Sequence, residues 1–199
     1  MIDGHGRFST QSAQRVADML ARHNVAFFEE PLHPADLVGF KRLAASSPVP
    51  LAAGERCYDV ASCMRLIAAG VAVIQPDVIH LGGIHRTAIV GAIADASNVQ
   101  ISLHNSTGPI ATAASLHLAA TMPNLYLQEM FEPNDAPWKV AVVKPAAKVI
   151  DGFVACPDGP GLGIEIDEAE IARHPFVPQD LSLLRESSVT GQSVIKPGQ

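Results

Sequence analysis

The stretch Val25-Ala26-Phe27-Phe28-Glu29-Glu30-Pro31 indicates how the chain folds. Its first four residues are apolar, and most of them are β-branched or aromatic, which favours a buried β-strand. Two acids follow the apolar run, and Pro31 then ends the strand because it has no N–H to donate. The stretch therefore predicts a strand that presents a carboxylate at its C-terminal end.

The same pattern recurs along the chain, with helical stretches between the strands. The other predicted strands are Met1–Ile2, Val49–Ala52, Val71–Ile74, Val99–Leu103 and Leu125–Leu127. The stretches with apolar residues at helical spacing are Ser12–Arg22, Pro34–Ala45, Val60–Ala69, Arg86–Ala96 and Ile110–Ala120. Strands that alternate with helices predict an α/β fold, in which helices cover a parallel sheet.

Each predicted strand is followed by an acid or a histidine, at separations of 22 to 27 residues. These residues are Asp3, Glu29, Glu55, Asp77, His104 and Glu129. In an open sheet, ligand groups gather at one switch point, whereas a (β/α) barrel collects them from the ends of several strands. No Gly-x-Gly-x-x-Gly follows a strand, so a dinucleotide-binding fold has little support. The pattern predicts a TIM-type (β/α) barrel with its site at the strand ends.

The number of strands is smaller than in a complete barrel. Such a barrel needs about eight strands and commonly about 250 residues, whereas six strands are expected in these 199 residues. Two βα units are expected to be missing before Met1, and the two exposed sheet edges would favour a homo-oligomer. We expect a partial barrel over residues 1–133, a C-terminal segment packing back on it over 134–191, and a tail over 192–199.

The composition limits the class of protein. Apolar residues make up 48% and charged residues 17%, which is typical of a packed core and excludes a disordered chain. The net charge of −6 argues against a nucleic-acid partner, which requires a basic face. No apolar run approaches the roughly 18–20 residues that cross a membrane, and no signal peptide is evident. Three cysteines without zinc spacing predict free thiols in a cytoplasmic protein.

Asp3, Glu29 and Glu55 would stand at one end of consecutive strands. Carboxylates that approach each other repel and raise each other's pKa. A divalent cation relieves the repulsion, and oxygen-only ligands favour Mg²⁺. A helix cap or a surface acid is the simpler explanation for one such residue, but three in register favour a metal site. Alternation along the strand predicts that Glu30 faces away from Glu29, as a structural acid.

Asp77 and His104 are predicted to lie on neighbouring strands at matching depth. A carboxylate beside an imidazole fixes its tautomer and raises its basicity, which suits a general base. A satisfied core histidine is the alternative interpretation. His5 lies two residues after Asp3 on the same face, where it could protonate a leaving group. His80 lies three residues past Asp77 and could contact a substrate.

Three further side chains complete the candidate site. Glu129 ends the last predicted strand, where it could hydrogen-bond a substrate oxyanion or orient another group. Arg7 and Arg56 follow two of the predicted metal ligands, and a guanidinium there could hold a substrate carboxylate. We therefore take both arginines as candidate substrate-binding residues.

Several short motifs resemble the enolase superfamily, in its mandelate racemase-like branch. They are Phe28-Glu29-Glu30-Pro31, Gly54-Glu55-Arg56, Gln75-Pro76-Asp77 and Leu103-His104-Asn105. The segment Asp3-Gly4-His5 resembles the Asp-x-His pattern of the sugar-acid dehydratases in that branch, and Gly108-Pro109-Ile110 with Gln128-Glu129 most resembles galactonate dehydratases. The likeness covers Met1–Phe131, and Pro157–Asp167 resembles the family's C-terminal segment.

The resemblance implies a magnesium-dependent lyase that removes water from an aldonate. Asp3, Glu29 and Glu55 match the ligands of a Mg²⁺ ion, which would hold the substrate carboxylate and stabilise the enediolate formed on losing the α-proton. His104, paired with Asp77, matches the base that removes that proton.

The resemblance also implies roles for His5 and Glu129, and other functions remain as alternatives. His5 matches the acid that protonates the departing 3-hydroxyl, and Glu129 matches the acid that hydrogen-bonds the substrate carboxylate. The product would be a 2-keto-3-deoxy acid. Family members also carry an N-terminal capping domain, which is not expected in this sequence. The alternatives are an inactive, self-associating barrel fragment, or a racemase or cycloisomerase that uses the same metal site.

Overall fold

The computed structural model describes residues 1–131 and 137–176. Met1–Asp167 forms one compact unit, and a second unit begins at Glu168. The tail predicted for residues 192–199 lies outside the described ranges, as do residues 134–136 and 177–191 of the predicted C-terminal segment. In the second unit, the described residues include the short helix α7 (Glu168–Ala172).

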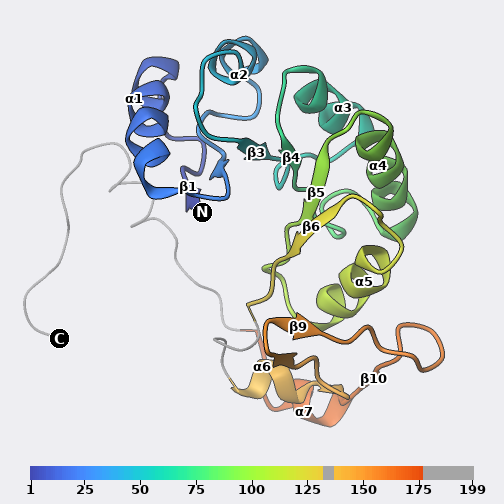
Figure 1. Cartoon of the computed structure of the whole chain (residues 1–199). Coiled ribbons are helices and arrows are strands. Elements are labelled where there is room, and N and C mark those ends of the chain that lie inside the picture. The colour runs from blue at the N-terminus through green and yellow to red at the C-terminus, as the bar shows by residue number, and fades with distance from the viewer. Residues whose placement is uncertain (132–136, 177–199) are drawn as a thin grey trace, which may run out of the picture. The chain divides into compact units, whose positions relative to one another are not determined.

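Six parallel strands form the main sheet, in the order β1 to β6, and each pairs with the next along the chain. They are β1 (Ile2–Asp3), β2 (Phe28–Glu29), β3 (Leu51–Ala53), β4 (Val73–Ile74), β5 (Gln100–Leu103) and β6 (Leu125–Gln128). Figure 1 shows the helices following one another along one side of this curved sheet. The predicted fold class is confirmed: the six strands form a half-barrel of the (β/α) type.

A helix follows each of the first five strands. These helices are α1 (Thr10–Leu20), α2 (Leu37–Ala44), α3 (Val60–Ala68), α4 (Ile84–Ala96) and α5 (Pro109–Ala119), with the short 3-10 helix η1 (Ala21–His23) after α1. Side chains at the N-caps of α1, α2 and α3 accept backbone N–H groups of the first turn and help to set where these helices begin. Asp36, for example, accepts the N–H of Gly39 at 2.8 Å, so α2 begins at Leu37 and not at the predicted Pro34. None of the helices in the described part of the chain has the length and apolar character needed to cross a membrane.

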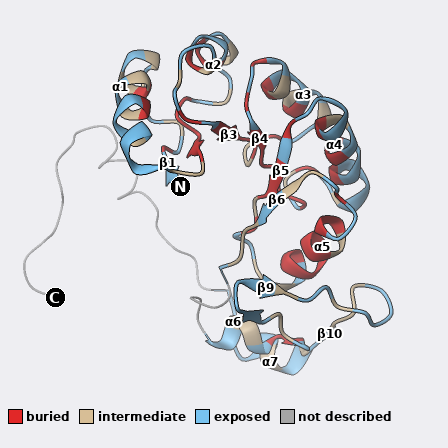
Figure 2. Cartoon of the chain, in the orientation of Figure 1, coloured by how far each residue is buried: buried red, intermediate tan, exposed pale blue. Residues whose placement is uncertain are grey.

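The core lies mainly between the sheet and its helices. Alternate strand residues point toward the helices, where Phe28, Leu51 and Ile74 pack in one cluster with Phe40 and Leu66. A smaller cluster of Phe27, Ala52 and Val73 covers the opposite face. Figure 2 shows the buried residues along the strands and on the helices that cover them.

The segment after residue 136 has a different architecture. It contains α6 (Pro137–Ala141) and two antiparallel strand pairs: β7 (Val143–Lys144) with β10 (Glu165–Ile166), and β8 (Val149–Ile150) with β9 (Phe153–Val154). Asp151 and Gly152 join β8 to β9, and both have positive φ angles, as a two-residue hairpin of type I′ requires. These are short extended pieces, and most of their residues are exposed.

Candidate functional site

Parallel pairing brings the polar strand ends together at one edge of the sheet. Asp3 lies directly opposite Glu29 in the register of β1 and β2. Glu55 follows β3 after Gly54, and Asp77 and His104 form an isolated bridge just beyond β4 and β5. Because all six strands run in the same direction, their C-terminal ends share this edge.

His104 is held between two carboxylates. Its Nδ1 lies 2.7 Å from Asp77 Oδ2, and its Nε2 lies 3.3 Å from Glu55 Oε2. Asp77 is buried and also accepts the backbone N–H groups of Ile79 and His80, at 2.6 and 3.1 Å. Because a carboxylate only accepts, Nδ1 donates to Asp77, which leaves the Nε2 lone pair free to take a proton.

This arrangement shifts both pKa values of the pair. Burial by itself would lower the pKa of His104, but the hydrogen bond to Asp77 and the charges of Glu129 and Glu55 raise it above its usual value. Burial by itself would raise the pKa of Asp77, but the hydrogen bonds from His104 and the backbone lower it. The pair therefore favours a charged carboxylate beside a basic imidazole.

Glu29 is the most buried of the three acids predicted to bind a metal. Its pKa is raised to about 7, first by burial and then by the charges of Asp3, Glu129 and Glu55, although a hydrogen bond with Gln75 opposes them. Gln75 was not among the residues singled out in the sequence. Its position in the motif Gln75-Pro76-Asp77, directly after the apolar run that forms β4, was the signal that could have found it.

Glu30 does not follow the expected alternation. Its φ angle is 32°, which lies outside the extended region, so the strand ends at Glu29. Arg56 Nε lies 3.3 Å from Glu30 Oε2 and 3.3 Å from Glu55 Oε1. The carboxylate of Glu30 is therefore linked to Glu55 through Arg56, and its role as a structural acid facing away from Glu29 stays a prediction.

The two predicted substrate-binding arginines differ in their surroundings. Arg56 lies between Glu30 and Glu55, and its guanidinium also donates to the carbonyl oxygen of His5 at 3.2 Å. Arg7 is exposed in the loop after β1, where its backbone forms a bridge with Leu32. Arg56 thus connects the ends of three successive strands.

His5 is paired with its predicted neighbour on β1. Its Nδ1 lies 3.0 Å from Asp3 Oδ2, and its backbone N–H donates to Asp3 Oδ1 at 2.8 Å. His5 has a φ angle of 46°, which turns the chain sharply directly after the strand. The imidazole is more than half exposed, so a substrate or solvent can reach it.

His80 lies beside the His104 ring. The two rings stack with centroids 5.9 Å apart, and His80 Nδ1 donates to the carbonyl oxygen of Glu55 at 2.7 Å. In the described part of the chain, Asp77, His80 and His104 form the one group whose possible ligand atoms all lie within 4.8 Å of one another. Asp3, Glu29 and Glu55 do not form such a group among the described residues. Asp3 is paired with His5, and Glu55 with Arg56 and His104.

Glu129 is fixed by Asn105, two residues after the end of β5. Its Oε2 accepts the backbone N–H of Asn105 at 2.7 Å, and its carbonyl oxygen accepts from Asn105 Nδ2 at 3.0 Å. Asn105 also donates to Thr112 Oγ1 at 2.8 Å, which connects this edge of the sheet to α5. Sequence reasoning did not single out Asn105, although it directly follows His104.

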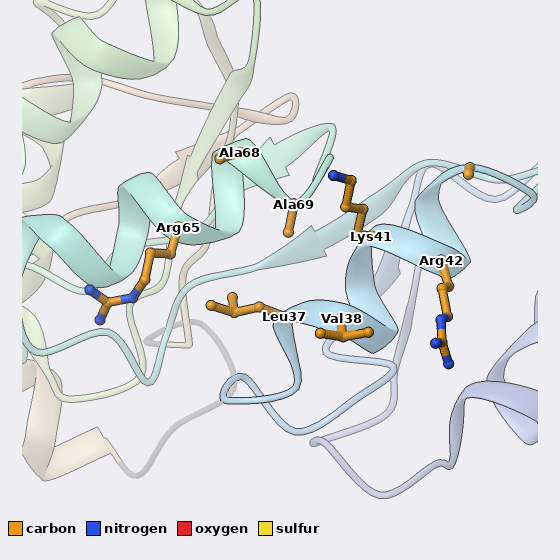
Figure 3. A pocket seen from close by; sticks show the side chains of 8 residues that line it. Leu37, Val38, Lys41, Arg42, Arg65, Ala68 and Ala69 are labelled. Carbon is orange, nitrogen blue, oxygen red and sulfur yellow. The ribbon is translucent and has the colours of Figure 1, made fainter.

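One hollow lies at the strand ends, and another lies on the outer surface between two helices. A cavity of about 400 Å³ is lined by Glu29, Gln75, Ser102 and Glu129 among others, so it opens onto the site. A larger groove of about 620 Å³ lies between α2 and α3, and its lining is mostly apolar. Figure 3 shows Leu37, Lys41 and Arg65 at this groove, which contains none of the predicted site residues. Of these two hollows, only the smaller one is lined by predicted site residues, Glu29 and Glu129.

Known proteins share both the sequence and the fold of this chain. A D-gluconate dehydratase of Thermoproteus tenax is 30% identical over 187 residues, which cover 94% of this chain and 38% of that protein. A D-galactonate dehydratase of Xanthomonas oryzae pv. oryzae (strain PXO99A) is 35% identical over 185 residues, covering 90% of this chain and 48% of that protein. The chain thus spans less than half the length of these relatives.

Solved structures agree with this relationship. A mandelate racemase/muconate lactonizing enzyme from Jannaschia sp. CCS1 superimposes with a TM-score of 0.84 at 33% identity, over 88% of this chain and 45% of that one. An enolase from Agrobacterium radiobacter, whose structure holds sodium and L-malate, gives a TM-score of 0.82 at 27% identity, over 89% of this chain and 49% of that one.

The family described as enolase C-terminal domain-like matches residues 1–170. This match takes in the six strands, their helices and every residue of the candidate site. The chain therefore belongs to the enolase C-terminal domain-like family.

Proposed function

We propose that this chain carries the catalytic part of a magnesium-dependent sugar-acid dehydratase of the galactonate dehydratase type. The observation that carries the proposal is His104, held by Asp77 at one ring nitrogen and facing Glu55 with the other. The curated relatives named as gluconate and galactonate dehydratases support the substrate class, an aldonate. The bound L-malate of the Agrobacterium radiobacter enolase is likewise a hydroxy acid.

His104 is the proposed base. Asp77 fixes the tautomer by accepting from Nδ1, so that Nε2 can remove the proton next to the substrate carboxylate. The raised pKa of His104 makes this nitrogen a better proton acceptor. Asp77 is a positioning residue in this proposal, because it acts through His104.

The donor set of Asp3, Glu29 and Glu55 fits a hard divalent cation. All three supply oxygen. Burial and then the charges of neighbouring acids raise the pKa of Glu29, and a cation at this place would stabilise its charged form. Arg56 and His104, which now hold Glu55, would have to share that carboxylate with the ion. When bound, Mg²⁺ would supply positive charge that orients the substrate carboxylate and stabilises the developing anion.

Two further residues complete the proposed elimination. His5 is exposed next to Asp3 and would protonate the departing 3-hydroxyl. Glu129, fixed by Asn105, would hydrogen-bond the substrate carboxylate. Loss of the α-proton to His104 and of the hydroxyl with a proton from His5 removes one water, and the enol product becomes a 2-keto-3-deoxy acid.

Metal binding by the chain is the first test. We expect MgCl₂ to raise the melting temperature of the purified chain, and Glu29→Gln to abolish this rise. Glu165→Gln, at an exposed acid on β10, is the matched control and should respond like the original chain. No response to magnesium in the original chain would contradict the metal site and favour the alternative of an inactive fragment.

The reaction is tested by incubating the chain with a panel of aldonates in D₂O. Elimination predicts a 2-keto acid, which His104→Asn abolishes. His5→Asn should abolish the 2-keto acid but leave exchange of the α-proton for deuterium, because His104 still removes that proton. Exchange without any 2-keto acid in the original chain would instead indicate a racemase, and 2-keto acid formation by His5→Asn would remove His5 from the role of acid.

A further inference from the structure

A second group of reactive side chains lies away from the strand ends, where His117 of α5 meets the loop of residues 156–163. Cys156 Sγ lies 3.5 Å from His117 Nδ1. The carbonyl oxygen of Leu162 lies 3.1 Å from His117 Nε2. One loop thus contacts both ring nitrogens, with its first residue on one side and Leu162 on the other.

These contacts determine where the ring carries its proton. A carbonyl oxygen can only accept, so Nε2 carries the proton that it donates to Leu162. In the neutral ring Nδ1 then has a lone pair, which faces the thiol of Cys156 and can take its proton. The thiol also lies 3.6 Å from the carbonyl oxygen of Pro157, which can accept a hydrogen bond but is too weak a base to remove the proton.

The loop is held in this position by its own packing. The side chain of Leu162 packs against the main core cluster, which fixes the carbonyl that orients His117. Gly163 has a φ angle of 66°, and its N–H donates to the carbonyl oxygen of Pro160 at 3.1 Å. A Cβ at Gly163 would lie 2.5 Å from Pro157 Cβ, so the two ends of the turn are in close contact.

Cys156 is accessible, whereas the other two cysteines are not. It is exposed and lines a cavity of about 760 Å³ together with Ile150 and Phe153. Cys57 and Cys63 are buried, with exposed fractions of 2% and 0%. Cys156 thus combines access from solvent with a histidine nitrogen 3.5 Å from its sulfur.

We propose that Cys156 is a modification site at which small organic hydroperoxides oxidise the thiol to a sulfenic acid, with His117 as the proton carrier. His117 Nδ1 takes the thiol proton, and the sulfur attacks the terminal oxygen of the hydroperoxide. The S–O bond forms as the O–O bond breaks, and the leaving alkoxide takes the proton from Nδ1. The thiol is oxidised by two electrons and the hydroperoxide is reduced to an alcohol, so no other reactant is needed.

The test compares two reagents on the whole chain. tert-Butyl hydroperoxide requires a proton for its leaving alkoxide, whereas iodoacetamide releases iodide and requires none. We expect His117→Gln, which can keep the contact with Leu162 but cannot carry the proton, to slow oxidation of Cys156 by on the order of a hundredfold. Alkylation should fall by a clearly smaller factor. Sulfenic acid is trapped with dimedone and located by mass spectrometry.

Three controls make the result decisive. Cys156→Ser should abolish dimedone labelling, and His85→Ala, at an exposed histidine of α4, should leave both rates unchanged. Circular dichroism and the melting temperature confirm that His117→Gln is folded, and His117→Ala is a second variant without any ring. Labelling of Cys57 or Cys63 instead, equal slowing of both reactions, or no slowing at all would each overturn the proposal.

Discussion

The sheet region, residues 1–131, and the segment of residues 137–167 are stabilised in different ways. The residues of β2, β3 and β4 are all buried, and the helices after them contribute Phe40, Leu66 and other fully buried side chains. In the later segment the residues of β8 and β10 are exposed, and Phe153 of β9 is 80% exposed. Both regions contain paired strands, but only the first encloses a packed core.

The difference shows where the free energy of unfolding should be concentrated. Hydrogen-bonded strand pairs contribute little net stability by themselves, because unfolded strands bond to water instead. Burial of apolar side chains provides the larger contribution, at roughly 25 cal/mol per Å² of apolar surface. Substitutions in the sheet region should therefore cost much more than similar substitutions in the later segment.

A matched pair of phenylalanines gives the largest expected contrast. Phe40 of α2 is fully buried in the main cluster, whereas Phe153 is exposed. Phe40→Ala should lower the free energy of unfolding by about 3–5 kcal/mol, and Phe153→Ala should change it by less than about 0.5 kcal/mol. Urea denaturation measures both values. Similar losses for the two variants would show that the later segment is part of the same core.

Glu30 provides the second contrast, which depends on pH. Its pKa is raised to about 7, first by burial and then by the charge of Glu55, although the charge of Arg56 opposes the shift. The pKa of this carboxyl is higher in the folded chain than in the unfolded chain. As the pH rises, the unfolded chain therefore loses the proton first. The stability that the protonated form provides is therefore present below about pH 4.5 and is lost as the pH rises through 7.

Glu30→Gln removes this dependence while keeping the shape of the side chain. As the pH rises from 5 to 8, the free energy of unfolding of the variant should increase by up to about 3 kcal/mol relative to that of the original chain. Each unit of pKa shift corresponds to about 1.4 kcal/mol. Glu165→Gln, in the exposed strand β10, is the control and should show no such trend. Urea denaturation at the two pH values measures the difference, and an equal effect at both would contradict the raised pKa of Glu30.

The strands of the fold and one pair of the candidate site could be predicted from the sequence. Apolar runs that end in a polar residue located all six strands, because burial of a parallel strand is a local property of composition. The pairing of Asp77 with His104 followed from their matching positions on neighbouring strands. The apolar run at 25–28 contributed only Phe28 to β2, since hydrogen-bond pairing and burial do not begin at the same residue.

The side-chain network around Glu30 could not be predicted. Its positive φ angle turns the chain out of the strand directly after Glu29, and the sequence pattern assumes regular alternation. Arg56 reaches Glu30, Glu55 and His5 from three strand ends, which depends on the conformation of a long side chain. The contact between Cys156 and His117 joins residues 39 positions apart and has no local signal.

A smaller effect is expected from the N-cap of α2 in the sheet region. Asp36 Oδ1 accepts the N–H of Gly39 at 2.8 Å, which satisfies one of the free donors at the start of the helix. Asp36→Ala should lower the free energy of unfolding by about 1 kcal/mol. Asp36→Asn should keep most of the stability that the cap provides, because Asn can also accept the N–H. Urea denaturation measures both variants. A loss in Asp36→Asn equal to that in Asp36→Ala would indicate that charge, and not the cap, is responsible.

The smallest effect is expected from the ion pair between β7 and the end of β10. Lys144 Nζ lies 2.9 Å from Asp167 Oδ2, but the lysine side chain is 72% exposed, so water and salt screen the charges. Lys144→Met should therefore lower the free energy of unfolding by no more than about 0.5 kcal/mol, and 1 M NaCl should remove the difference. The urea midpoints of both chains at low and high salt measure this. A loss of several kcal/mol that persists in salt would mean that residues 143–167 contribute to the stability of the sheet region as strongly as its own core.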